Sequence, residues 1–210
     1  MAYSVKLSIE ELAALGALIG QPIDQVTTNG WSAELHSGEL RQAVIPAEVS
    51  TPDSDHPHGV VERPMLSLDG QSLVAGSSSV LAKNLGTLRA INAISTLVAF
   101  TPVVDCPAVE ILPGVVLPPS RGYGMKFFAP NELAQAQRIV GCEALVDLDI
   151  AFELVCDLAP SVVIYTRGYF VHVSVLGLPT DEEWVASNAY VRRPVRPGFK
   201  AEPADAMDSR

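Results

Sequence analysis

A short run of acidic residues and histidines offers the most evident metal-binding chemistry in the chain. Two carboxylates and two imidazoles lie close together and supply the oxygen and nitrogen donors that divalent metals accept. The candidate ligands are Asp53, Asp55, His56 and His58. Their spacing matches no metal-binding motif, and Asp, Ser, Pro and His are also ordinary residues of solvated turns. The segment is therefore either a metal site or an exposed loop.

A second group of carboxylates lies in an apolar stretch near residue 150. If residues 145–155 form a strand, Asp147, Asp149 and Glu153 are expected to point to one face. Closely spaced carboxylates bind Mg²⁺, or one of them acquires a raised pKa and acts as an acid. The alternative is that these acids form the solvated face of a half-buried antiparallel strand.

Two weaker signals have simple structural explanations. His172 lies on an expected strand at 169–175, where a lone histidine is more often a hydrogen-bonded structural residue than a base. Residues 76–79, Gly-Ser-Ser-Ser, precede an expected helix, and its N-terminus is a place where anions bind. A simpler explanation than an anion site is that Ser79 caps this helix.

The C-terminal segment is basic and rich in proline, whereas the chain as a whole is acidic. We expect residues 192–210 to form an extended arm that binds an acidic face of a partner, or that is a solvated terminus. The candidate partner-binding residues are Arg192, Arg193, Arg196 and Lys200.

Familiar catalytic signatures are absent from the sequence. It contains no phosphate-binding glycine loop, nucleophile elbow, zinc-protease motif or calcium-binding loop. The odd number of cysteines and the absence of a Cys-x-x-Cys pair predict free thiols rather than disulfides or a cysteine-based zinc site. The cysteines are Cys106, Cys142 and Cys156. We therefore expect no cofactor.

Several elements can be assigned from capping residues and hydrophobic spacing. Ser8 and Glu11 form a capping box that opens a helix at 9–19. Alternating residues predict a β-hairpin at 31–45 with one solvated face, and a strand at 60–68. The strongest β signal lies at 162–175, where Arg167-Gly168 marks the turn. Further helices are expected at 80–98, 130–140 and 181–190, the first of them central and largely covered.

Two regions are harder to interpret. Residues 143–157 fit both a strand and a helix, and strict alternation from Val146 to Leu154 favours the strand. Residues 101–121 are rich in proline, which keeps strands short and places them at sheet edges. This stretch is also the one plausible seam in the chain.

Composition places the chain among folded globular proteins. Of its 210 residues, 48% are hydrophobic, and 24 acidic against 14 basic residues give a formal net charge of −10. This balance disfavours disorder and, because phosphate contacts need cations, nucleic-acid binding. The pattern predicts an α+β fold, an antiparallel sheet of hairpins with about four helices packed on it. Residues 1–191 would form the single domain.

These observations favour a non-enzymatic protein that acts through protein contacts. It would be a subunit of a larger bacterial or phage particle, or a neutralising partner of another protein, with self-association into a homo-oligomer expected. The alternative is a metal-dependent hydrolase that uses the Asp/His loop or the carboxylate cluster. The N-terminus has no signal-peptide pattern and no segment resembles a membrane span, so we expect a cytoplasmic protein.

Overall fold

The chain folds mainly into antiparallel β-structure. A computed structural model describes residues 2–49, 61–68, 79–106, 109–117, 120–139, 142, 144–167, 170–175 and 189–197. These residues form thirteen strands but only two α-helices and one 3₁₀ turn. The predicted α+β sheet with about four packed helices is therefore wrong, because the longest predicted helix, at 80–98, is part of a strand and the helix predicted at 130–140 is short.

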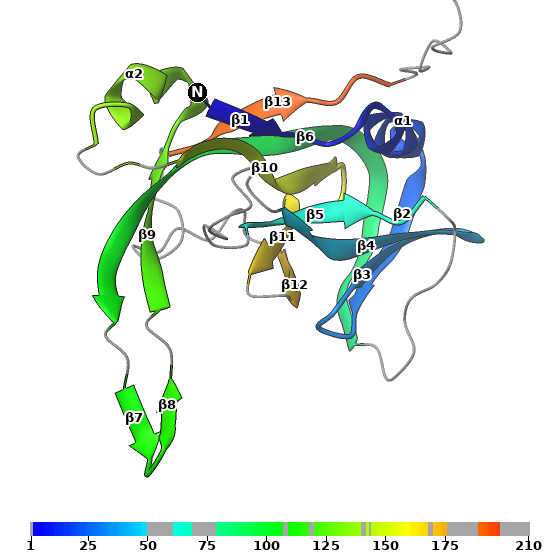
Figure 1. Ribbon diagram of the computed structural model, residues 1–210. Coiled ribbons are helices and arrows are strands. Elements are labelled where there is room, and N and C mark those ends of the chain that lie inside the picture. Colours follow the sequence, from blue (N-terminus) through cyan, green and yellow to red (C-terminus); the bar gives the residue numbers. More distant parts are fainter. Residues whose placement is uncertain are drawn as a thin grey trace, which may run out of the picture.

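One long strand, β6 (Ser79–Cys106), organises the sheet. Its first part pairs with β2 (Pro22–Thr28), and its middle part pairs along one edge with β10 (Ala144–Cys156). The other edge carries β13 (Val191–Pro194) and then β9 (Ser120–Phe128). Figure 1 shows that β6 turns over the top of the body, so a single strand connects both halves of the fold.

The bend in β6 lies where its pairing changes from β2 to β10. Asn84 and Gly86 both have positive φ angles, 53° and 81°. Glycine adopts this conformation without the steric cost that other residues incur. The turn after β10 packs against the bend, where the backbone N–H of Asp157 donates to the Thr87 carbonyl at 3.2 Å. The bend is therefore held from both sides.

The central helix predicted at 80–98 is thus a strand. The middle of β6 is buried on both faces, with every residue from Ala93 to Phe100 buried. A strand covered on both faces reads as a nearly continuous apolar run, in which helical spacing appears by chance. Positive φ at Asn84 and Gly86 would also interrupt a helix.

A meander of strands completes one side of the body. The hairpin predicted at 31–45 is confirmed as β3 (Ala33–Ser37) and β4 (Leu40–Val49), with the turn at 38–39. The strand predicted at 60–68 is β5 (Val61–Leu66), paired with β4. Strand β5 then lies against β10 and against β11 (Val162–Arg167), which closes the body around its core.

The N-terminal helix follows its sequence signals. Helix α1 (Ile9–Leu18) begins after Ser8, whose hydroxyl accepts from the Glu11 amide while the Glu11 carboxylate accepts from the Ser8 amide. Glu11 is buried and also receives two hydrogen bonds from Arg63, at 2.9 and 3.0 Å. The same carboxylate therefore caps α1 and ties it to β5.

The C-terminal half supplies the remaining body strands. The strand favoured at 143–157 is confirmed as β10, and the hairpin predicted at 162–175 as β11 and β12 (Phe170–Ser174). Strand β1 (Ala2–Val5) runs parallel to the start of β10. Strand β13 begins at Val191, so the first residues of the expected C-terminal arm belong to the sheet.

A two-stranded ribbon leaves the body beyond Ala144, the first residue of β10. The last residue pair of β10 and β6 is Ala144 with Phe100, whereas β6 and β9 stay paired to Cys106 and Ser120. A separate hairpin, β7 (Val109–Leu112) and β8 (Val115–Leu117), lies beyond them. Figure 1 shows both pairs projecting away from the body. We call residues 101–124 the ribbon.

The helix predicted at 130–140 is shorter than expected. A 3₁₀ turn at Pro130–Glu132 leads into α2 (Leu133–Ala136), so proline starts the helical segment as anticipated. The helix predicted at 181–190 falls mostly outside the described residues.

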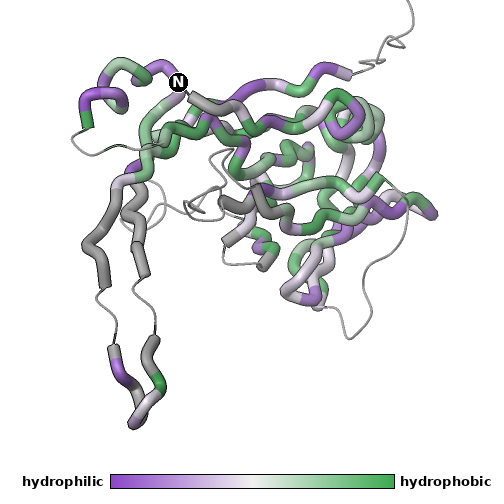
Figure 2. Tube along the Cα trace, viewed as in Figure 1, coloured by the Kyte–Doolittle hydropathy of each residue, from purple (hydrophilic) through white to green (hydrophobic). Residues whose placement is uncertain are grey.

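Burial concentrates where β6 and β10 pair. Hydrophobic residues follow both strands through the body in Figure 2. The largest side chains with almost no exposed surface include Phe100, Phe152, Leu88, Ile91 and Ile94. Because these residues come from distant parts of the sequence, folding of the body depends on long-range pairing.

Candidate functional site

A bulge in β10 separates the candidate carboxylates. Asp149 lies opposite Ser95 of β6 and Glu153 opposite Asn92, so five residues of β10 span four of β6. Ser95 and Asn92 are three positions apart on a continuous strand and therefore point to opposite faces. The structure brings Asp147 and Asp149 to one face and places Glu153 on the other. A single face bearing all three acids does not form.

Asp149 is fully buried and surrounded by donors. One carboxylate oxygen accepts from the Ser95 hydroxyl at 2.6 Å. The other accepts from the Leu7 amide at 2.9 Å and from Arg193 at 2.8 Å. The Lys6 ammonium, which also bonds Asp147, lies 3.6 Å away. Buried carboxylates are tolerated when paired in this way. Asp149 therefore joins β6, β10 and β13 to the segment that follows β1.

Glu153 has a matching arrangement on the opposite face. It accepts from the Asn92 amide at 2.9 Å and from the Arg192 guanidinium at 2.9 Å. The bond to Glu153 raises the pKa of Arg192 above its usual value. The Arg192 guanidinium also lies 5.3 Å from the centre of the Tyr190 ring, within reach of a cation–π contact. Consecutive arginines of β13 therefore pair with acids on opposite faces of one sheet.

These contacts account for most of the candidate residues that the structure describes. The acids of β10 meet the arginines of β13 within the chain, and among the described residues no group of three or more His, Cys, Asp or Glu side chains could hold a metal. The Asp53, Asp55, His56 and His58 candidates, together with Lys200, lie outside the described residues. The sequence alone did not reveal Lys6, Asn92 and Ser95 as partners, because they come from distant strands.

A second polar cluster lies on a strand face that we expected to be solvated. Glu34 and His36 of β3 are buried, with 5% and 7% of their surface exposed. The His36 ring has Thr27 3.1 Å from Nε2 and Gln25 3.3 Å from Nδ1. Arg41 contacts Nδ1. The alternation of polar residues along 32–36 identified this face but not its burial.

The groups around His36 favour one tautomer, although Arg41 lies near both ring nitrogens, in contact with Nδ1 and 3.3 Å from Nε2. Arg41 and the Gln25 amide nitrogen can only donate, so Nδ1 accepts and Nε2 carries the hydrogen. Nε2 then donates toward Thr27 and the Glu34 carboxylate, which lies 3.3 Å away. Burial lowers the pKa of His36, and the charge of Arg41 lowers it further. The ring is thus a neutral structural group whose lone pair is already occupied.

This arrangement is not a catalytic triad. A triad needs the acid on one imidazole nitrogen and the nucleophile on the other. Here Glu34 and Thr27 both face Nε2, while Nδ1 faces Arg41. The cluster therefore joins β2, β3 and β4 instead of activating a hydroxyl.

The remaining single-residue candidates have structural surroundings. His172 stacks on Tyr165, its cross-strand neighbour, with ring centroids 5.2 Å apart. Burial raises the thiol pKa of both Cys142 and Cys156 above the usual value, which favours the protonated thiol. Both are free cysteines.

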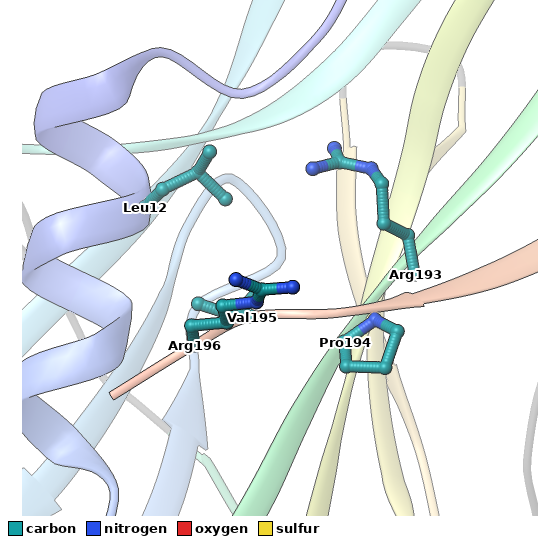
Figure 3. A pocket seen from close by; sticks show the side chains of 5 residues that line it. All are labelled: Leu12, Arg193, Pro194, Val195 and Arg196. Carbon is teal, nitrogen blue, oxygen red and sulfur yellow. The ribbon is translucent and has the colours of Figure 1, made fainter. Parts of the chain in front are cut away.

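A groove opens between α1 and β13. It has a volume of about 410 Å³ and is lined by Leu12, Arg193, Pro194, Val195 and Arg196. Figure 3 shows the guanidinium groups of both arginines in the space between the helix and the strand. Part of the basic segment singled out from the sequence therefore borders a surface groove.

Comparisons with known proteins do not identify the chain. No protein-family model, curated protein or solved structure matches it. Neither described α-helix is long and apolar enough to cross a membrane.

Proposed function

We propose that the protein is an assembly subunit that associates with further copies of itself through the ribbon, residues 101–124. The observation that supports this proposal is the position of the ribbon, which projects beyond the body in Figure 1. The alternative of a metal-dependent hydrolase has no support from the described side chains. A self-associating subunit is also what the sequence led us to expect.

The pairing pattern leaves the ribbon open along its edges. Within the described chain, residues 101–106 of β6 pair only with β9, and β7 and β8 pair only with each other. A two-stranded hairpin is marginally stable in water without a third strand or a packed face. Contact with another chain would supply both.

The residue types of the ribbon suit side-chain contacts with another protein. Its 24 residues include five prolines and only three charged residues, Asp105, Glu110 and Arg121. Proline blunts strand edges against uncontrolled pairing. A partner would therefore pack on the apolar side chains of the ribbon more than extend its backbone ladder. Val115, at the turn of the outer hairpin, is 48% exposed.

Val115→Asp tests this proposal, with Leu158→Asp as the matched control. Both replace an exposed apolar residue with a charge, but Leu158, 77% exposed, lies on the turn after β10. We expect a concentration-dependent oligomer in sedimentation velocity and native mass spectrometry. Val115→Asp should weaken it at least about tenfold, which corresponds to ~1.4 kcal/mol, and Leu158→Asp should leave it unchanged.

Two results would contradict the proposal. One is a wild-type chain that stays monomeric up to the highest concentration measured. The other is an oligomer that both aspartate variants weaken equally, because a general charge effect would then explain the loss.

A further inference from the structure

The groove between α1 and β13 holds a cation that has no partner among the described residues. Arg196 makes no hydrogen bond or ion pair with any described residue, and it is exposed. Most other described arginines have a partner. Arg63, Arg89, Arg192 and Arg193 each pair with a carboxylate, and Arg41 contacts His36. The exposed Arg138, after α2, also has no described side-chain partner, but it does not line the groove. On a chain with an excess of acids, an unpaired arginine beside a groove is an available anion-binding group.

The groove combines this charge with apolar surface. Leu12 lies on its helix side, and Val195, which belongs to the main core, lies on its strand side. Arg193 adds a second guanidinium. Its Nη2 donates to Asp149, and 43% of its side chain is exposed. A carboxylate between Arg193 and Arg196, attached to an apolar stem, would match both features.

The shape of the groove favours a peptide segment over an enclosed small molecule. Small-molecule sites bury most of their ligand, whereas Arg193, Pro194 and Arg196 are all exposed. Strand addition to β13 is also limited. The Val195 amide donates to the Ile91 carbonyl of β6 at 2.8 Å. Because backbone groups alternate along an antiparallel ladder, the backbone of residue 194 faces away from β6. Residue 194 is a proline and has no N–H to donate to an added strand. Recognition would therefore depend on side chains.

We infer that this groove receives a carboxylate-bearing segment of a second copy of the chain. The inference rests on the proposed self-association and names a second contact for it. Charge complementarity supports this occupant, because the chain has 24 acidic residues and the groove presents two guanidinium groups. Each copy would present one groove, so the contact can repeat from copy to copy.

Arg196→Glu is the variant that tests the groove, and Lys83→Glu is its control. Lys83 is an exposed cation on the first part of β6, so the control makes the same change in net charge elsewhere. Arg193 is left in place because it bonds Asp149. We expect Arg196→Glu to weaken the oligomer at least about tenfold in sedimentation velocity, with Lys83→Glu near wild type. Arg196→Lys, which keeps the charge, should retain more association than Arg196→Gln.

The outcomes separate this inference from the proposal about the ribbon. If Val115→Asp weakens the oligomer but Arg196→Glu behaves as Lys83→Glu does, the groove has no role and the ribbon still does. If the wild-type chain is monomeric, both ideas fail. If Arg196→Glu weakens association while Val115→Asp does not, the groove is an interface and the ribbon proposal fails. Circular dichroism and thermal unfolding should show that each variant keeps its fold.

Discussion

Strand β6 passes from the body into the ribbon without a break, and its two parts have opposite surroundings. Residues 88–100 pair with β10 along one edge and with β13 and β9 along the other. Residues 101–106 keep only β9 as a described partner. The apolar character of the chain continues across this boundary, so composition does not distinguish the two parts.

The difference lies in how each part satisfies its backbone and its charges. The body surrounds β6 with strands, and it pairs buried acids with Lys6, which follows β1, and with the arginines of β13. Within the described residues, each strand of the ribbon pairs with one other strand. An internal network therefore holds the body, and an external partner would be needed to cover the ribbon.

Asp149→Asn should give the largest loss of stability. Donors surround both oxygens of Asp149, so an amide group at this position must face at least one of them. Arg193 and Lys6 would also lose a negative partner. We expect the free energy of unfolding to fall by about 2–3 kcal/mol, since an unsatisfied buried group and a broken ion pair both contribute. Urea denaturation followed by circular dichroism measures it.

Asp147→Asn is the matched control for this experiment. Asp147 lies two positions earlier on the same face, but its side chain is 31% exposed and its described partner is Lys6. Exposed ion pairs contribute less than ~1 kcal/mol, so this variant should stay within that range. Equal losses in the two variants would mean that burial of Asp149 is not what stabilises the body.

Gly86→Ala should have the next largest effect, because it acts at the bend of β6. Gly86 has a φ of +81°, and a Cβ there would lie 2.1 Å from an Asp157 oxygen and 2.7 Å from Leu158 Cγ. That oxygen accepts from the Thr87 amide at 2.7 Å, a bond that a displaced side chain would lose. We expect a loss of about 2 kcal/mol from backbone strain and the lost bond together.

Gly38→Ala separates backbone strain from crowding. Gly38 also has a positive φ, +57°, but nothing lies within 4 Å of an added Cβ. Only the conformational cost of about 1–2 kcal/mol should remain. If the two alanine variants unfold at the same urea concentration, the contact between the bend and the turn after β10 has no measurable weight.

The elements that sequence alone predicted correctly are those with local determinants. The capping box of Ser8 and Glu11 defines the start of α1, and alternation defines the β3–β4 and β11–β12 hairpins. Strand β6 was missed because burial on both faces removes the period that distinguishes strand from helix. Its true partners, β10 above all, are distant in sequence.

The candidate residues divide in the same way. Sequence patterns singled out Asp149 and Arg193, but as separate sites, a carboxylate cluster and a partner-binding arm. Their pairing depends on β6, which lies between β10 and β13 and is continuous while β10 is bulged. The alternation of residues 146–154 shows no sign of the bulge. The sequence therefore could not show that Glu153 points to the face opposite to that of Asp149.

Removal of most of the ribbon should have the smallest effect on the free energy of unfolding. In this variant an Asn-Gly turn replaces residues 104–121 and joins Val103 to its partner Gly122. Asn-Gly favours the tight turn that closes a two-residue hairpin. The free energy of unfolding of the body should stay within ~0.5 kcal/mol of the wild-type value, while the oligomer is lost.

Protein concentration decides how this result is read. Self-association stabilises the folded state by mass action, so an associating wild-type chain gains apparent stability as its concentration rises. The free energy of unfolding is therefore measured at two protein concentrations. For the shortened chain, the two values should be the same. If it is destabilised by more than ~2 kcal/mol at the lower one, well outside the range of a surface change, the ribbon is part of the body's own folding unit. The contrast between the two parts of β6 would then be wrong.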